Sequence, residues 1–138
     1  MAERYYIDTA IWVDFHENRK DRFRPLGEWA LKMFRGIAQT GGIVIYSDMV
    51  IDELLRRYPM HIIHKAFNII PKSNFKKVYA NSEQSAEADR LSRERELPFA
   101  DCFHAILARD NFAIMVSRDR HFEQLRDIAD TKKPEELF

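Results

Sequence analysis

The sequence predicts an α/β fold built on a doubly wound parallel sheet. Two observations lead to this prediction. Short apolar runs recur about every 30 to 40 residues, and the stretches between them have the apolar periodicity of amphipathic helices. We expect residues 1–138 to form a single domain, because a chain of 138 residues buries one sizeable core and is too short for two ordinary domains.

Four segments have the pattern of strands. The second is introduced by Gly41-Gly42 and is apolar throughout, as a strand covered on both faces would be. The last follows a turn signal at Asp110-Asn111. The predicted strands are residues 4–7, 43–46, 75–79 and 113–116, and the predicted helices are residues 26–39, 49–58, 60–69, 82–96, 99–109 and 121–128.

The composition excludes several classes of protein. Hydrophobic residues make up 46% of the chain, which is typical of a folded protein and not of a disordered one. Cys102 is the only cysteine, so neither an internal disulfide nor a multi-cysteine zinc site is expected. No run has the length and apolarity of a signal peptide or membrane span, and we expect a cytoplasmic protein. The formal net charge is +0, although basic residues cluster within 19–24 and 65–77.

Acidic residues follow three of the predicted strands. Asp8 comes directly after the first strand, the helix after the second strand carries Asp48 and Glu53, and Asp119 follows the fourth strand. Ligands of an open parallel sheet bind beyond the carboxyl ends of its strands, which share one edge. We therefore expect these carboxylates to lie close together.

Asp101 lies near the start of a helix that is apolar almost all round and is expected to be buried. A buried carboxylate needs a partner, which is either the free N–H groups of the first helical turn after Pro98 or a cation. The helix terminus is the commoner explanation for Asp101 alone, and Asp48 and Asp119 also have the alternative of capping a helix. Asp8 follows an interior strand and is harder to explain in this way.

The helix predicted at residues 49–58 carries two acids whose side chains point to different faces of the helix. At about 100° per residue, Glu53 falls at the edge of the apolar arc, between Met49 and Val50, and Asp52 falls on the opposite side. We expect Glu53 to face inward and Asp52 to face solvent.

Four inward acids, Asp8, Glu53, Asp101 and Asp119, would repel one another unless a divalent cation neutralised them. Ligand sets made only of oxygen suit Mg²⁺ or Mn²⁺. Such an ion can orient a water, lower its pKa and stabilise the charge that develops on a phosphate oxygen. The acids therefore predict metal-dependent hydrolysis of a phosphodiester.

With these acids the chain resembles the PIN domain, particularly the VapC-like toxin ribonucleases. The resemblance spans nearly the whole chain and rests on the order and spacing of its motifs. The motifs are residues 6–9, 47–55, 98–108 and 116–122, with a similar ending at 134–138. By this resemblance Asp8, Glu53, Asp101 and Asp119 occupy the family's four acidic positions, and Ser117 occupies its Thr/Ser position beside the last acid.

The resemblance implies a three-layer α/β/α sandwich with a five-stranded parallel sheet in the order 3-2-1-4-5. It also implies Mg²⁺ or Mn²⁺ as cofactor, RNA as substrate, a homodimer and, in the toxin branch, an antitoxin partner. The chain departs from the family at two places. Ala10 stands where a polar Ser or Asn is common, and the charged stretch Glu17 to Arg24 makes the first connection unusual.

Several polar residues have two interpretations each. Thr9 either contacts the site or caps the next helix. His104 lies one turn after Asp101, and a structural role is commoner for such a histidine than a catalytic one. Asp14 is expected to face solvent from a helix, with an auxiliary acid as the alternative. No metal-ligand spacing is evident for His16, His61, His64 and His121.

Other functions stay open at this point. An RNA-processing PIN nuclease without an antitoxin would carry the same acids. A receiver-like phospho-acceptor module shares the sheet topology, but it needs an acidic pair after the first strand, where this chain has Asp8-Thr9-Ala10. A non-catalytic PIN scaffold would be indicated by the loss of an acid, and all four are present.

Overall fold

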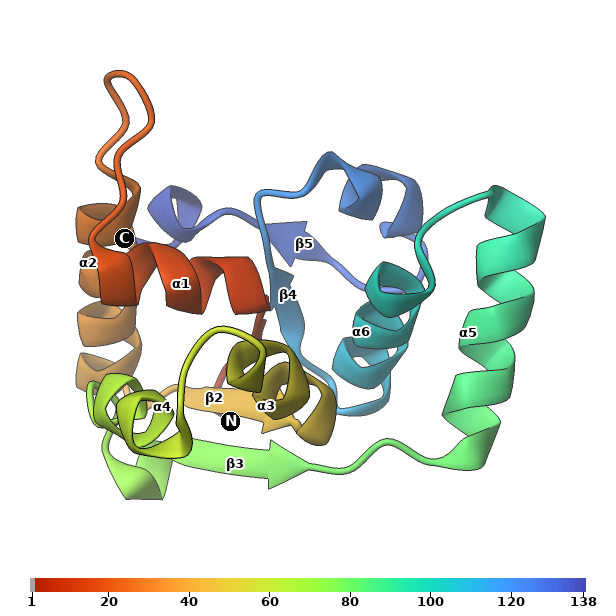
Figure 1. Cartoon of the computed structure of the whole chain (residues 1–138), viewed down its shortest axis with the longest axis horizontal. Helices are drawn as coiled ribbons and strands as arrows, with labels where there is room; N and C mark the ends of the chain where they lie inside the picture. Colours follow the sequence, from red (N-terminus) through yellow and green to blue (C-terminus); the bar gives the residue numbers. More distant parts are fainter. Residues whose placement is uncertain (1) are drawn as a thin grey trace.

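The computed structural model describes residues 2–138 and contains one five-stranded sheet (Figure 1). The strands are β1 (Arg4–Ile7), β2 (Ile43–Ser47), β3 (Phe75–Val78), β4 (Ile114–Val116) and β5 (Thr131–Lys132). All pairings are parallel and the order is β3-β2-β1-β4-β5, which confirms the predicted fold class and strand order. The central strand is β1, in which Tyr6 pairs with Ile45 of β2 and with Met115 of β4.

Helices flank the sheet. They are α1 (Thr9–Glu17), α2 (Leu26–Gln39), α3 (Asp48–Leu55), α4 (Met60–Phe67), α5 (Ser82–Arg95) and α6 (Phe99–Asp110), with 3₁₀ turns η1 (Lys72–Asn74), η2 (Arg120–Leu125) and η3 (Pro134–Leu137). In Figure 1, α1 and α2 lie on the left, α5 and α6 lie on the right, and strands run between the two pairs. Within residues 2–138, every helix falls short of the length and apolarity that crossing a bilayer requires.

Three elements differ from the sequence prediction. Helix α1 is not among the predicted helices, because its buried residues Ile11 to Asp14 are consecutive and leave no stripe with a period of 3.6 residues. The polar pair Thr131–Lys132 is not among the predicted strands but forms β5, since its backbone pairs with β4. The α-helix predicted at residues 121–128 is the shorter 3₁₀ turn η2.

The charged first connection forms a loop that projects from the body between α1 and α2 (Figure 1). Asp21 and Arg24 exchange two backbone hydrogen bonds of 2.9 and 2.8 Å at its tip. At its base, a Cβ on Gly27 would lie 2.5 Å from the Cα of Asn18. Only glycine therefore allows α2 to begin so close to the end of α1.

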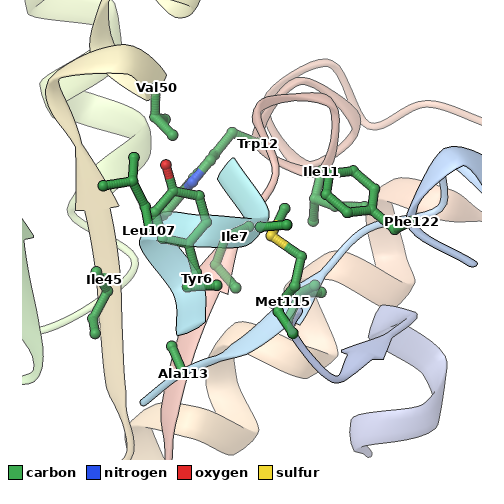
Figure 2. Close-up of a cluster of buried hydrophobic side chains, with 14 of the residues drawn as sticks. Tyr6, Ile7, Ile11, Trp12, Ile45, Val50, Leu107, Ala113, Met115 and Phe122 are labelled. Carbon is green, nitrogen blue, oxygen red and sulfur yellow. The ribbon is translucent and has the colours of Figure 1, made fainter. Parts of the chain in front are cut away.

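The core lies around β1 and α6. Tyr6, Ile7, Leu107 and Met115 are fully buried, and Figure 2 shows their side chains converging between the sheet and the helices. The predicted burial of the apolar helix at 99–109 is confirmed, because every residue of α6 from Cys102 to Ala108 is buried. This packing fixes the carboxyl ends of β1 and β4 and the first turn of α6 relative to one another.

Candidate metal centre

Asp8 lies at the carboxyl end of the central strand, beside the end of β4. Its backbone N–H donates to the carbonyl of Val116 at 2.9 Å. The hydroxyl of Ser117, which is 3% exposed, donates to Asp8 Oδ2 at 2.7 Å and accepts from the backbone N–H of Asp119 at 3.0 Å. One buried hydroxyl thus connects the acids that follow two neighbouring strands.

Neighbouring carboxylates repel Asp8. Burial raises the pKa of Asp8, and the carboxylates of Glu53 and Asp119 raise it further. His104 and the hydrogen bond from Ser117 lower it, but the pKa stays above the ordinary value. Acids from α3 and from the end of β4 therefore lie close enough to Asp8 to act on its charge.

Asp101 and Asp119 meet across the imidazole of His121. Nδ1 of His121 lies 3.0 Å from Asp101 Oδ2 and 2.9 Å from Asp119 Oδ1. Asp119 also caps η2, because its Oδ1 accepts the backbone N–H of His121 at 2.9 Å. Asp101 projects from the first turn of α6, yet it accepts no backbone N–H within the described residues. Asp119 therefore caps a helix through a hydrogen bond, whereas Asp101 lies in the first turn of α6 without one.

The pKa of Asp101 is raised to about 6. Burial is the main cause, and the negative charges of Asp119 and Asp8 add to it, while His121 and His104 oppose it. The side chain is 17% exposed. At neutral pH the ionised Asp101 side chain therefore lowers the stability of the metal-free fold.

Glu53 reaches the site from α3, whose first turn is capped by Ser47 through its bond from the Val50 N–H at 3.3 Å. Glu53 Oε1 accepts from Thr9 Oγ1 at 2.9 Å and lies 2.6 Å from His104 Nε2. Burial raises the pKa of Glu53, but the contacts with His104 and Thr9 outweigh it, so the pKa is lowered. These contacts therefore favour the ionised form of Glu53.

No lysine or arginine within residues 2–138 forms an ion pair with any of the four acids. Arg118, which is adjacent in sequence to Asp119, instead contacts Glu135 at 2.8 Å and Asp14 at 3.9 Å. The prediction that Asp14 faces solvent is wrong, because Asp14 is 7% exposed and lies near the Arg118 guanidinium. Within the described chain, two imidazoles are the only potentially cationic groups at ion-pair distance from the acid quartet.

The donor set fits a divalent cation. One ligand atom each from Asp101, Asp119 and His121 lies within 4.8 Å of the others. Nδ1 of His121 is shielded from solvent and makes no hydrogen bond of good geometry in the described chain, although both carboxylates are near. The imidazole extends the all-oxygen set that the sequence predicted, and it suits Mn²⁺ better than Mg²⁺.

The structure brings all the sequence-predicted site residues to one end of the sheet. Glu53 is turned toward His104 and Asp52 is exposed, as helical geometry predicted. Thr9 begins α1 and also contacts the site through Glu53. Sequence reasoning missed the two imidazole contacts, since His104 was given a structural interpretation and His121 no ligand spacing. The sequence did contain one indication of the role of His121, which lies two residues after Asp119. When Asp119 caps the following turn, the chain bends and brings the His121 side chain back toward the Asp119 carboxylate.

Comparison with known families gives one match. The model of the PIN domain family matches residues 5–128, which is most of the chain. A search of the curated proteins finds no significant match.

Solved structures share the fold at low sequence identity. A chain of a toxin–antitoxin complex from Klebsiella pneumoniae has a TM-score of 0.68 and 14% identity, covering 94% of this chain and 97% of that one. A chain of VapBC2 from Rickettsia felis, bound to a promoter DNA fragment, has the same score and identity, covering 94% and 98%. A protein from Pyrobaculum aerophilum gives a TM-score of 0.58 at 16% identity, covering 99% and 95%. These likenesses show the fold.

Proposed function

The chain belongs to the PIN domain family, and from this premise we propose that it is a metal-dependent endoribonuclease that hydrolyses RNA phosphodiester bonds. Asp8, Glu53, Asp101 and Asp119 are the proposed catalytic and metal-binding residues, and Mg²⁺ or Mn²⁺ is the proposed cofactor. Ser117 and Thr9 are proposed to hold the acids in place through the hydrogen bonds described above.

The observation that supports this proposal most directly is the uncompensated charge. The other acids of the quartet raise the pKa values of Asp8 and Asp101, and no lysine or arginine of the described chain forms an ion pair with any of the four. A protein gains no stability from such an arrangement without a cation, because the like charges are partly withdrawn from water. The arrangement is explained if its purpose is to bind a metal.

The proposed reaction depends on a bound cation and on acids that are already held in position. When bound, a divalent cation supplies an activated water and stabilises the charge that develops on the phosphate oxygen. Asp8 is held by Ser117 through Oδ2, and Glu53 is held by Thr9 and His104 through Oε1. These contacts fix both carboxylates before a ligand arrives, so little reorganisation is needed on binding.

The proposal is tested by incubating the purified protein with single-stranded and structured RNA in Mg²⁺ or Mn²⁺. We expect cleavage that stops with EDTA and with Asp8→Asn. Asp52→Asn is the matched control, because Asp52 is an exposed acid on the same helix as Glu53, and it should leave cleavage unchanged. Cleavage that survives both EDTA and Asp8→Asn would refute the proposal.

We further propose that this nuclease is the toxin of a toxin–antitoxin pair. Chains of similar fold come from toxin–antitoxin complexes, which supports an antitoxin partner. Induced expression should then arrest bacterial growth, and expression of the Asp8→Asn variant should not. Co-expression of the product of a neighbouring gene should relieve the arrest and co-purify with the protein. An active nuclease whose expression leaves growth unaffected would instead favour RNA processing without an antitoxin.

A homodimer is part of the proposal, as the resemblance to this family implied. Light scattering coupled to size-exclusion chromatography tests it directly. A mass of about twice the 16.4 kDa of the chain is expected, and a mass equal to that of one chain would contradict it.

A further inference from the structure

Three buried side chains form a hydrogen-bonded relay that ends on Glu53. Ser47 Oγ lies 2.6 Å from Tyr6 Oη, and Tyr6 Oη lies 2.7 Å from His104 Nδ1. On the other side of the ring, His104 Nε2 lies 2.6 Å from Glu53 Oε1. Ser47, Tyr6 and His104 are at most 1% exposed. The relay therefore crosses the core from β2 through β1 to α6 and ends at an acid on α3.

We propose that His104 is a positioning residue which, held by Tyr6 and Ser47, fixes the direction of the Glu53 carboxylate in the metal centre. This inference rests on the proposed function above. His104 would touch neither RNA nor metal. It would act through Glu53, by occupying one of its oxygens and leaving the other for the site.

The donors and acceptors of the relay can be assigned from chemistry. A carboxylate oxygen only accepts, so the proton between His104 and Glu53 is on Nε2. With a neutral ring, Nδ1 accepts from the Tyr6 hydroxyl, which accepts from the Ser47 hydroxyl, which accepts from the Val50 N–H. A ring protonated on both nitrogens would reverse the two hydroxyls and leave the Ser47 proton without an acceptor in the described chain. In both cases Nε2 donates to Glu53, so the positioning does not depend on the charge of the ring.

The relay leaves a single oxygen of Glu53 free. Oε1 already accepts from His104 Nε2 and from Thr9 Oγ1. Oε2 accepts no hydrogen bond from residues 2–138. The two donors come from α6 and α1, and together they restrict rotation of the carboxylate. Glu53 is thereby restricted to offering Oε2 to a cation.

The position of the relay favours a role in positioning Glu53. The alternative is that the three polar side chains only satisfy one another's hydrogen bonds in the core. A buried histidine can be satisfied by any backbone carbonyl, but both ring nitrogens of His104 are used by side chains. Neither Tyr6 nor His104 closes a turn or caps a helix. Apolar residues of similar volume would fill this part of the core without three polar groups to satisfy. The presence of these polar groups in the core is therefore better explained by their effect on Glu53, the acid at the end of the relay.

The test compares two substitutions of His104 that distinguish the role of Nε2 from that of Nδ1. Glutamine places an amide nitrogen about where Nε2 lies, and asparagine reaches only about as far as Nδ1. Mn²⁺ binding to the full chain is measured by calorimetry. We expect His104→Asn to weaken binding about 10- to 100-fold, the usual effect of removing a group that orients a metal ligand. His104→Gln should retain most of the affinity, and Tyr6→Phe should give a smaller loss than His104→Asn.

Catalysis provides a second readout, which a merely structural role would not produce. At limiting Mn²⁺, kcat of His104→Asn should fall while KM for RNA stays unchanged, because a side chain 1% exposed cannot contact the substrate. Saturating Mn²⁺ should restore the rate. Leu107→Ala is the matched control: Leu107 is also fully buried on α6, so this change should lower the melting temperature without altering the Mn²⁺ affinity.

The outcomes separate this inference from the proposed function. If the wild-type chain binds no Mn²⁺, the proposed function fails and the inference fails with it. If the wild type binds Mn²⁺ and His104→Asn binds it equally well, only the inference is overturned. Equal losses for the asparagine and glutamine variants would also overturn it. Should His104→Asn fail to fold, Tyr6→Phe decides in the same way, because it keeps the volume of the core.

Discussion

Replacing Asp101 by asparagine should stabilise the metal-free protein at neutral pH. The pKa of Asp101 is raised from 3.8 to about 6 in the fold. A carboxyl group with a raised pKa binds its proton more tightly when folded, so its ionisation favours unfolding. This destabilisation is absent below pH 4, develops between the two pKa values and is complete above about pH 6. Each pKa unit corresponds to about 1.4 kcal/mol.

The magnitude follows from that shift. The full difference corresponds to about 3 kcal/mol, and because water reaches the 17% of the side chain that is exposed, we expect about 1–3 kcal/mol. Asparagine keeps the shape and cannot ionise. At pH 7 the melting temperature of Asp101→Asn should therefore exceed that of the wild type by several degrees, since 1 kcal/mol shifts it by about 2–8 °C. At pH 4 the two proteins should melt at similar temperatures.

Adding Mn²⁺ should reverse the order of stability. A ligand at 1,000 times its Kd stabilises the folded state by about 4.1 kcal/mol, which exceeds the advantage expected for Asp101→Asn. The wild type should receive this stabilisation, and Asp101→Asn should lose most of it. Calorimetry or circular dichroism at pH 4 and pH 7, with EDTA or with Mn²⁺, measures all four conditions. Asp52→Asn, an exposed acid outside the site, should behave as the wild type throughout. An Asp101→Asn variant less stable than the wild type in EDTA at pH 7 would show that Asp101 is a structural acid and would refute the reasoning.

Three further predictions test the surroundings of the site. Ser117→Ala removes the hydroxyl that joins the two strand-end acids and should lower RNA cleavage about 10-fold or more; unchanged cleavage in a steady-state assay would argue against that role. His121→Asn should weaken Mn²⁺ binding more than Mg²⁺ binding, because imidazole is a better ligand for Mn²⁺, and equal losses in calorimetry would contradict it. Arg118→Ala removes the guanidinium nearest to the buried Asp14 carboxylate. It should lower the free energy of unfolding by up to about 3–5 kcal/mol in urea titrations. A change below about 0.5 kcal/mol would show that the contact is unimportant.

The sheet was predictable because its strands follow simple rules. The continuous apolar runs at β2 and β4 report burial on both faces, and parallel connections through helices leave few topologies. The two-residue strand β5 was not predictable from its own residues, since Thr131–Lys132 has no apolar pattern and is ordered by pairing with β4. Helix α1 was not predicted because it is buried on several sides. Its apolar residues therefore do not repeat with the period of 3.6 residues that marks an amphipathic helix.

The acids of the site could be located in sequence because each follows a strand or begins a helix. Their partners could not be located in this way. Whether His104 turns toward Glu53 or toward the core depends on the packing of α6 against α3 and β1, which involves residues about 50 and 100 positions apart. His121 reaches Asp101 only because Asp119 caps η2 and bends the chain there. Such contacts depend on side-chain direction in the assembled fold, which one sequence does not contain.

The structural and functional interpretations of these acids are not alternatives, because a carboxylate has two oxygens. Asp8 uses Oδ2 for Ser117, Glu53 uses Oε1 for His104 and Thr9, and Asp119 uses Oδ1 for the backbone of η2. In each case the other oxygen accepts no hydrogen bond from the described residues. A capping or hydrogen-bonded acid is therefore an oriented ligand with one oxygen fixed by the protein and one left for a cation.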